Sequence, residues 1–166
     1  TAEKGWWVDG PKMDLFNAIG SHGIFAEDLG MIDDGVRNLL SQANLSGLKV
    51  LQFAFDSDEN NLYLPWNISE NSITYTGTHD NSTLVGYVKG LSKEELEKQK
   101  AKIQKSLTYL GINKPLSGVY KISEAIINVC YGSKSKLAIV PMQDILFLDD
   151  NFRTNTPGKT GAWQVR

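Results

Sequence analysis

The sequence predicts an α/β fold built on a parallel sheet, and three observations lead to this prediction. Four short apolar runs are spaced along the 166 residues, helical patterns lie between them, and polar residues follow each run. The runs are nearly continuous in apolar character, as expected for strands that are covered on both faces. Their alternation with helices favours parallel pairing. Four strands are half of an eight-stranded barrel, so we expect residues 1–166 to form half of one, with no separate second domain.

The strands are expected at runs that are too short for helices and, in three cases, rich in β-branched or aromatic residues. These runs are residues 23–26, 48–53, 73–76 and 137–141. The segment 63–72 contains proline and asparagine between two such runs and is expected to be a loop.

Three helices are expected beside these strands. Residues 35–43 have apolar residues at helical spacing and two preceding aspartates, which suit the positive end of a helix dipole. The longest helix is expected over 92–110, because Ser92-Lys93-Glu94-Glu95 forms a capping box and a glycine follows as a stop. A third, amphipathic helix includes residues 122–129. Cys130 continues its apolar face and is expected to be inert core.

Composition excludes several classes of protein. The 17 basic and 19 acidic residues nearly balance, and the densest basic stretch, 93–105, is interleaved with glutamates, so no nucleic-acid partner is expected. No apolar run approaches the ~18–20 residues that span a bilayer, so no membrane association is expected. A single cysteine and the lack of a signal-peptide pattern predict a cytoplasmic location. Both ends resemble the interior of a longer sequence, so we expect a fragment or a processed chain.

Polar residues cluster where each expected strand ends. Glu27 and Asp28 follow the first strand, Asp56 the second, residues 78–81 the third, and residues 143–144 the fourth. The carboxyl ends of parallel strands are where active sites form in α/β sheets and barrels. Because a random distribution would place polar groups at both edges of the sheet, four groups at one edge indicate a functional site.

Two carboxylates at such an edge suit the cleavage of a glycosidic bond, which needs one protonated and one ionised group. Glu27 follows an apolar run that would desolvate it and favour its protonated form. Asp80 lies among the hydrogen-bond donors of residues 78–81, which would keep it ionised. Glu27 as the proton donor and Asp80 as the charged stabiliser are therefore chemically consistent.

Structural interpretations of the same residues remain open. Asp28, and less readily Glu27, could cap a helix, and His79 beside Asp80 could be a hydrogen-bonded structural pair. A magnesium site formed by Glu27, Asp28, Asp56 and Asp80 is a further alternative, although their spacing matches no specific metal signature. No metal and no other cofactor is expected.

Several blocks of this sequence resemble a known enzyme family. The three most distinctive are Phe25-Ala26-Glu27-Asp28-Leu29-Gly30, Lys49-Val50-Leu51-Gln52-Phe53-Ala54-Phe55-Asp56 and Tyr75-Thr76-Gly77-Thr78-His79-Asp80-Asn81. Together with residues 5–11, 141–146 and 153–158, they resemble the 4-alpha-glucanotransferases, also called amylomaltases or disproportionating enzymes. The similarity runs in order along the whole chain.

The resemblance implies a fold, an activity and residue roles. The family has a (β/α)8 TIM-type barrel, and this chain resembles its C-terminal half, strands five to eight. The activity is the retaining transfer of α-1,4-glucan segments between maltooligosaccharides. Glu27 would be the general acid/base, Asp80 the transition-state stabiliser, and His79 a contact to the sugar at the cleavage point. The remaining implied substrate contacts are Asp56 and Asn155, with Phe55 near the path of the glucan.

The chain departs from the family in ways that affect its activity. The family's nucleophile is an aspartate in an Arg-Ile-Asp-His-type motif, and no such motif occurs here. The chain alone is therefore expected to be inactive and to need the N-terminal half of the same enzyme, or to pair its open sheet edges in a homo-oligomer. Lys12 and Trp66 stand where the family usually has glycine and histidine. Competing hypotheses are an α-glucan hydrolase and a catalytically dead glucan-binding or structural fragment.

Overall fold

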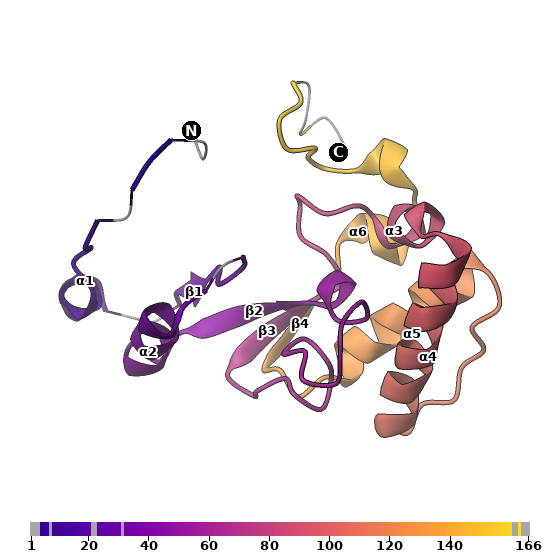
Figure 1. Cartoon of the computed structure of the whole chain (residues 1–166), viewed down its shortest axis with the longest axis horizontal. Helices are drawn as coiled ribbons and strands as arrows, with labels where there is room; N and C mark the ends of the chain where they lie inside the picture. Colours follow the sequence, from indigo (N-terminus) through magenta and orange to yellow (C-terminus); the bar gives the residue numbers. More distant parts are fainter. Residues whose placement is uncertain (1–3, 7, 21–22, 31, 161–162, 164–166) are drawn as a thin grey trace. The chain divides into compact units, whose positions relative to one another are not determined.

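The computed structural model describes residues 4–6, 8–20, 23–30, 32–160 and 163 (Figure 1). The chain divides into two compact units, Thr1–Leu48 and Lys49–Arg166. The boundary falls within strand β2 (Ser46–Val50), so this strand belongs to both units. The sequence-based assignment of one domain stays a prediction.

The first unit contains a parallel pair of strands and two helices. Strand β1 (Phe25–Ala26) pairs with β2, with Phe25 opposite Ser46 and Ala26 opposite Gly47. Helix α1 (Met13–Ile19) was not expected from the sequence. Helix α2 (Asp34–Gln42) was expected, and it begins where the side chain of Asp33 accepts a hydrogen bond of 2.9 Å from the Val36 N–H. The predicted helix start next to two aspartates is therefore confirmed.

The residue before α1 has an unusual backbone conformation. Lys12 has φ +52°, in the region that favours glycine. This geometry explains why glycine suits the position, where this sequence has lysine instead.

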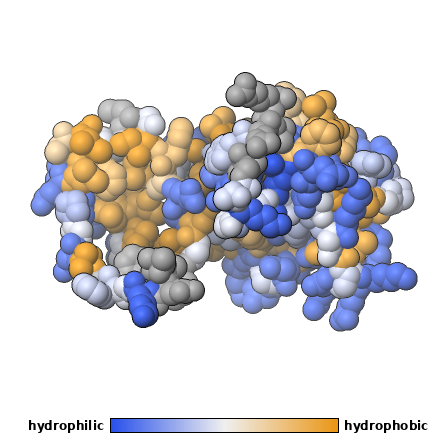
Figure 2. Space-filling view, turned by 90° about the horizontal axis from the view of Figure 1, so that it is seen from above, coloured by the Kyte–Doolittle hydropathy of each residue, from blue (hydrophilic) through white to orange (hydrophobic). Residues whose placement is uncertain are grey.

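Apolar side chains of the first unit are exposed in this chain (Figure 2). Among the described residues of this unit they are Trp6, Val8, Leu15, Ile19, Phe25 and Val36. Soluble monomers rarely expose large contiguous apolar patches, and such patches often mark sites of interaction with other proteins.

The second unit is built on two further parallel strands. Strand β3 (Ser72–Tyr75) pairs with β4 (Leu137–Ile139), with Ile73 opposite Leu137. The hydrogen-bonded order of the four strands is β1-β2-β3-β4, the same as their order in the chain. All four strands overlap the predicted runs, but the strand prediction for 51–53 is wrong, because these residues form the 3-10 turn η1 after β2. Strands β1 and β2 pair in parallel, as do β3 and β4, which confirms the α/β prediction.

Helices pack beside β3 and β4 (Figure 1). Helix α5 (Val119–Gly132) contacts α3 (Leu84–Gly90), α4 (Lys93–Tyr109) and β4. Short turns complete the unit: α6 (Met142–Ile145) and the 3-10 turns η1 (Leu51–Phe53) and η2 (Asp150–Phe152). No helix in the described part of the chain is long and apolar enough to cross a bilayer.

The core of the second unit is apolar and includes the single cysteine. Leu51, Leu84, Leu107 and Ile126 are fully buried in it. Cys130 is also fully buried, and its burial raises the pKa of the thiol to about 12. A thiol that stays protonated is a poor nucleophile, so the structure agrees with the expected role of Cys130 as inert core.

The ends of helix α4 follow the predicted signals. The Ser92 hydroxyl accepts a hydrogen bond from the Glu95 N–H at 3.3 Å, and the Glu95 carboxylate accepts one from the Ser92 N–H at 2.8 Å. Gly111, just beyond the helix, has φ +70°, which glycine adopts without steric cost. The capping box and the glycine stop therefore set the bounds of α4.

The capping box gives a first prediction. Replacing Ser92 with alanine leaves a helix N–H without its partner and should lower the free energy of unfolding by about 1 kcal/mol. Ser117→Ala, in an exposed loop residue, is the matched control and should change stability little. Urea denaturation of the chain measures both, and equal stabilities of the two variants would contradict the assignment.

Candidate active site

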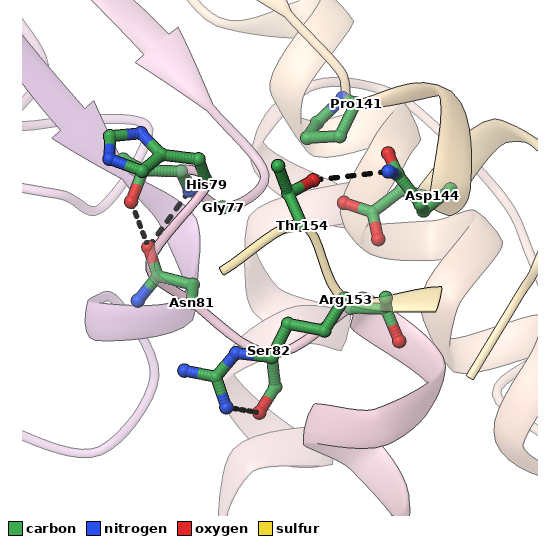
Figure 3. Close-up of a pocket in the computed structure, with 11 residues that line it drawn as sticks. Gly77, His79, Asn81, Ser82, Pro141, Asp144, Arg153 and Thr154 are labelled. Carbon is green, nitrogen blue, oxygen red and sulfur yellow. Dashed lines mark hydrogen bonds between the residues drawn. The ribbon is translucent and has the colours of Figure 1, made fainter. Parts of the chain in front are cut away.

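A compact turn after β3 presents His79 and Asp80 to solvent. The Thr78 N–H and hydroxyl both donate hydrogen bonds to the Asn81 side-chain oxygen, each at 2.8 Å (Figure 3). The Asn81 backbone N–H donates to the Thr78 carbonyl at 3.2 Å. Asparagine often closes turns in this way. The side chains of His79 and Asp80 are about half exposed, at 47% and 46%. The turn therefore fixes the backbone while leaving both side chains accessible.

The chain after η2 returns to this turn and contacts it. The Asn155 side-chain amide donates to Oδ1 of Asp80, and the Asn155 N–H donates to the His79 carbonyl at 3.1 Å. The structure thus brings together three residues named from the sequence: His79, Asp80 and Asn155.

One carboxylate oxygen of Asp80 receives most of these contacts. Nε2 of His79 lies 3.3 Å from Oδ1, which also accepts the hydrogen bond from Asn155. Among the described residues, no hydrogen bond to Oδ2 of Asp80 is found. The Asn155 amide therefore holds one oxygen of the carboxylate beside the His79 ring, and the other oxygen accepts no hydrogen bond from the described residues.

Arg153 and Trp163 also contact this group, although neither was named as a site residue from the sequence. The Arg153 guanidinium donates to the Asp80 carbonyl at 2.5 Å and to the Asn155 carbonyl at 2.8 Å. The Trp163 ring lies against His79, with 5.1 Å between ring centroids. The available sequence signal was the position of Arg153, two residues before Asn155 in a family-like block.

A buried carboxylate supports the turn from below. Asp144, in α6, is only 2% exposed. Its two oxygens accept hydrogen bonds from the Thr76 hydroxyl at 2.6 Å and from the Leu84 N–H at 2.7 Å. Burial raises the pKa of this carboxyl above its ordinary value, while the two hydrogen bonds oppose the rise. Asp144 therefore acts as a structural anchor for both ends of the 76–84 segment.

A second carboxylate anchors the start of helix α3. One oxygen of Asp150 accepts a hydrogen bond from the Thr83 N–H at 2.9 Å. A Cβ atom at Gly86 would overlap the Asp150 carboxylate. Glycine at this helical position therefore allows η2 to approach α3 and holds the start of the C-terminal segment close to the turn.

A small polar recess lies beneath the turn (Figure 3). Its volume is about 20 Å³, and its lining includes Ser82, Gln143, Arg153 and Thr154. This volume accommodates about one water molecule and is far below the ~300–1,000 Å³ of typical ligand pockets. The recess is therefore too small to hold a ligand of the size of a sugar.

The other predicted substrate contacts lie in different environments. Asp56 is exposed just beyond η1. Phe55 is 1% exposed and belongs to the core cluster, so its ring is enclosed by the protein. Glu27 is exposed after β1, in the first unit, so the described residues do not form the apolar enclosure expected around it. The grouping of Glu27 with Asp80 stays a prediction.

Asp28 has a structural contact. Its carboxylate accepts a hydrogen bond from the Leu48 N–H at 2.6 Å. A Cβ atom at Gly47 would overlap this carboxylate. The helix-capping role considered for Asp28 is wrong, because Asp33 caps α2. Asp28 instead links the segment after β1 to β2.

Trp66 packs against helix α4. Its ring lies edge-on to Tyr109, with ring centroids 5.7 Å apart. Nζ of Lys105 lies 5.0 Å from the centroid of the Trp66 ring. Its indole N–H donates to the Glu59 carbonyl at 3.3 Å. Trp66, which stands where the family usually has histidine, therefore packs the 57–67 loop against helix α4.

No group of three or more His, Cys, Asp or Glu side chains within the described ranges is arranged to hold a metal ion. The candidate site is instead a carboxylate held by one amide donor, with a histidine ring beside it.

Comparisons with known proteins agree on one family. The family model described as 4-alpha-glucanotransferase matches residues 1–166. The 4-alpha-glucanotransferase of Synechocystis sp. is 41% identical over 175 residues, which cover 100% of this chain and 32% of the relative. The chloroplastic/amyloplastic 4-alpha-glucanotransferase of Solanum tuberosum is 39% identical over 167 residues, which cover 98% of this chain and 27% of the relative.

A solved structure has the same fold. An amylomaltase from Streptococcus agalactiae in complex with acarbose superposes with a TM-score of 0.82 at 33% identity, covering 99% of this chain and 32% of that one. The chain spans about a third of the length of the curated relatives it matches.

The close approach at Gly86 gives a second prediction. Alanine normally stabilises a helix by about 1 kcal/mol relative to glycine, but Gly86→Ala should displace Asp150 and leave the Thr83 N–H unpaired, at a cost of about 1–3 kcal/mol. Gly90→Ala is the matched control in the same helix, because a Cβ there meets nothing within 4 Å. Urea denaturation should rank Gly86→Ala below Gly90→Ala, and the reverse order would contradict the anchoring role of Asp150.

The buried anchor gives a third prediction. Asp144→Asn keeps an acceptor for the Leu84 N–H and places an amide beside the Thr76 hydroxyl, so the fold should be retained. Asp144→Ala should cost about 1–3 kcal/mol for each donor left unpaired. Thermal unfolding of both variants at neutral pH checks this difference.

The pH dependence of Asp144 has a defined sign. Because its pKa is raised in the folded chain, the folded state binds the proton more tightly than the unfolded state. Its contribution to stability is therefore largest below the unfolded pKa of about 4 and is lost as the pH rises through the raised folded value. Asp144→Asn should become more stable relative to the original chain over that range, whereas parallel pH curves would rule out the effect.

Proposed function

This chain belongs to the 4-alpha-glucanotransferase family, and we propose that it supplies part of the site where such an enzyme transfers α-1,4-glucan segments between maltooligosaccharides. The observation that supports this proposal is the oriented carboxylate of Asp80. Its Oδ1 accepts a hydrogen bond from Asn155 and lies 3.3 Å from Nε2 of His79, while the side chain remains half exposed. A fixed negative charge of this kind suits a transition state that develops positive charge at the anomeric carbon.

The proposed reaction has two steps with retention of configuration. First, a nucleophilic carboxylate attacks the anomeric carbon, the bond to the glycosidic oxygen breaks, and Glu27 gives its proton to that oxygen. Next, Glu27 takes the proton from the 4-hydroxyl of an acceptor sugar as that oxygen displaces the carboxylate. Asp80 stabilises the positive charge in both steps. His79 contacts the sugar at the cleavage point, and Asn155 and Asp56 are nearby substrate contacts.

The nucleophile would come from the N-terminal half of the same enzyme. We propose that the chain forms strands five to eight of a (β/α)8 barrel. The sequential strand order supports this arrangement, because a barrel adds each strand next to the previous one. The exposed apolar side chains of the first unit also support it, since the preceding half would cover them. In the absence of that half, the end strands β1 and β4 are the edges through which two copies would pair.

The proposal also covers the natural substrates and the location in the cell. The natural substrates would be maltooligosaccharides and other α-1,4-glucans such as starch or glycogen. The cytoplasmic location inferred from the sequence stays a prediction, because the relatives include a chloroplastic/amyloplastic enzyme.

The experiment is a maltotriose assay of the chain with the N-terminal half of its parent enzyme added. A ladder of longer maltooligosaccharides should appear only with both halves present. Glu27→Gln should lower the rate by about 10²–10⁴-fold as expected for a general acid/base, and Asp80→Asn by about 10²–10³-fold. Glu94→Gln, on an exposed residue of α4, is the matched control and should leave the rate unchanged.

Other products would favour the competing hypotheses. Glucose and maltose without longer chains would indicate a hydrolase. Association of the halves without any product would indicate a glucan-binding or structural fragment. A ladder from this chain alone would show that the assignment of the nucleophile is wrong.

A further inference from the structure

Arg153 connects three groups around the candidate site. Its Nε–H donates to the Asn155 carbonyl at 2.8 Å, and one terminal nitrogen donates to the Asp80 carbonyl at 2.5 Å. The other terminal nitrogen donates to the Ser82 hydroxyl at 3.5 Å (Figure 3). Within the described part of the chain, no carboxylate lies within ion-pair distance of the guanidinium. Its hydrogen bonds are therefore directed to backbone and hydroxyl oxygens, which fixes geometry.

These contacts close a ring of interactions. Arg153 holds the backbone carbonyls of Asp80 and Asn155, and the side chains of the same two residues are hydrogen-bonded to each other. Movement of either side chain relative to the other would break at least one of these bonds. The ring therefore fixes the spacing between the carboxylate and the amide.

The ring joins segments that secondary structure does not hold. Asp80 lies in a turn and Asn155 in an irregular segment, 75 residues apart in the chain. The Asp150 anchor at Thr83 fixes the C-terminal segment only up to η2. Arg153 is the next residue after that 3-10 turn, and its hydrogen bond to the Asn155 carbonyl holds the segment that follows.

We propose that Arg153 is a positioning residue that sets the geometry of the Asp80–Asn155 pair. Its planar guanidinium presents several donors in fixed directions, which the single ammonium group of lysine does not reproduce. Lysine at this position would retain the charge and lose the simultaneous contacts. The geometric part of this inference is independent of the activity, and its catalytic part rests on the proposed function.

The geometric part is tested by NMR spectroscopy of the ¹⁵N-labelled chain. The chain has three arginines, Arg37, Arg153 and Arg166. One arginine Nε–H signal should be protected from exchange and should disappear in Arg153→Lys. In the same variant the Asn155 backbone N–H, which donates to the His79 carbonyl, should exchange about 2- to 10-fold faster, the range that the loss of one hydrogen bond implies.

Arg37→Lys is the matched control, because Arg37 is exposed on α2. It should leave both signals unchanged. An unchanged exchange rate of the Asn155 N–H in Arg153→Lys would overturn the proposal, whatever the activity of the chain.

The catalytic part is tested by a double-mutant cycle in the two-half maltotriose assay. Arg153→Lys should lower kcat about 10- to 100-fold with little change in KM, because a small displacement of a transition-state group acts on the chemical step. In the Asp80→Asn background the same substitution should add little, since Arg153 acts through Asp80 and its partner.

The outcomes separate two kinds of failure. An equal loss from Arg153→Lys in both backgrounds would show that Arg153 does not act through Asp80 and would overturn the positioning role. Full activity of Asp80→Asn would instead overturn the proposed function of Asp80, while the exchange measurements would still decide whether Arg153 fixes the geometry.

Discussion

The buried carboxylate of Asp144 is the interaction on which the candidate site depends. Its two oxygens hold Thr76, which directly follows β3, and Leu84, the first residue of α3. The turn that carries Asp80 lies between these two points, so both of its ends are held by one side chain. A buried charge is costly unless its oxygens are paired. The same pairing that stabilises the anion thus limits how far the turn can move.

Further contacts hold the residues between these two points and connect them to the C-terminal segment. The Gln52 side chain donates to the Ser82 carbonyl at 2.8 Å, and a Cβ at Gly77 would lie 2.6 Å from its amide nitrogen. Asp150 then attaches the C-terminal segment at Thr83, and Arg153 and Asn155 attach it to the tip of the turn. Each contact joins residues distant in sequence. The geometry around Asp80 is therefore a product of tertiary folding, even though the turn itself is local.

The sequence predicted the regular elements better than the roles of individual acids. The strands, α2 and α4 have strong local signals, such as the capping box at Ser92. Helices α1, α3 and α6 are seven residues or shorter, and helices of that length depend on tertiary packing more than on propensity. Acids at strand ends also look alike in sequence. Asp28 and Asp144 accept backbone N–H bonds, whereas Asp80 is half exposed.

Neighbouring residues illustrate the same limit. Phe55 and Asp56 are adjacent, yet the first is enclosed in the core and the second is exposed. The direction of each side chain depends on how the backbone leaves β2 through η1, which the pattern of residue types does not specify. Proximity to Asp80 along the sequence was informative only for His79. Asn155 could be named through family resemblance alone, because its contact with Asp80 spans 75 residues.

The proposed glucan transfer has two requirements, and the described residues meet one of them. The described residues orient a carboxylate in advance, which reduces the reorganisation needed when charge develops. Transfer to a sugar rather than to water requires in addition that water be excluded. His79 and Asp80 are about half exposed, and the recess beneath them has room for about one water molecule. Orientation of the carboxylate is thus built into this chain, whereas under the proposed function the exclusion of water would have to come from groups other than the described residues.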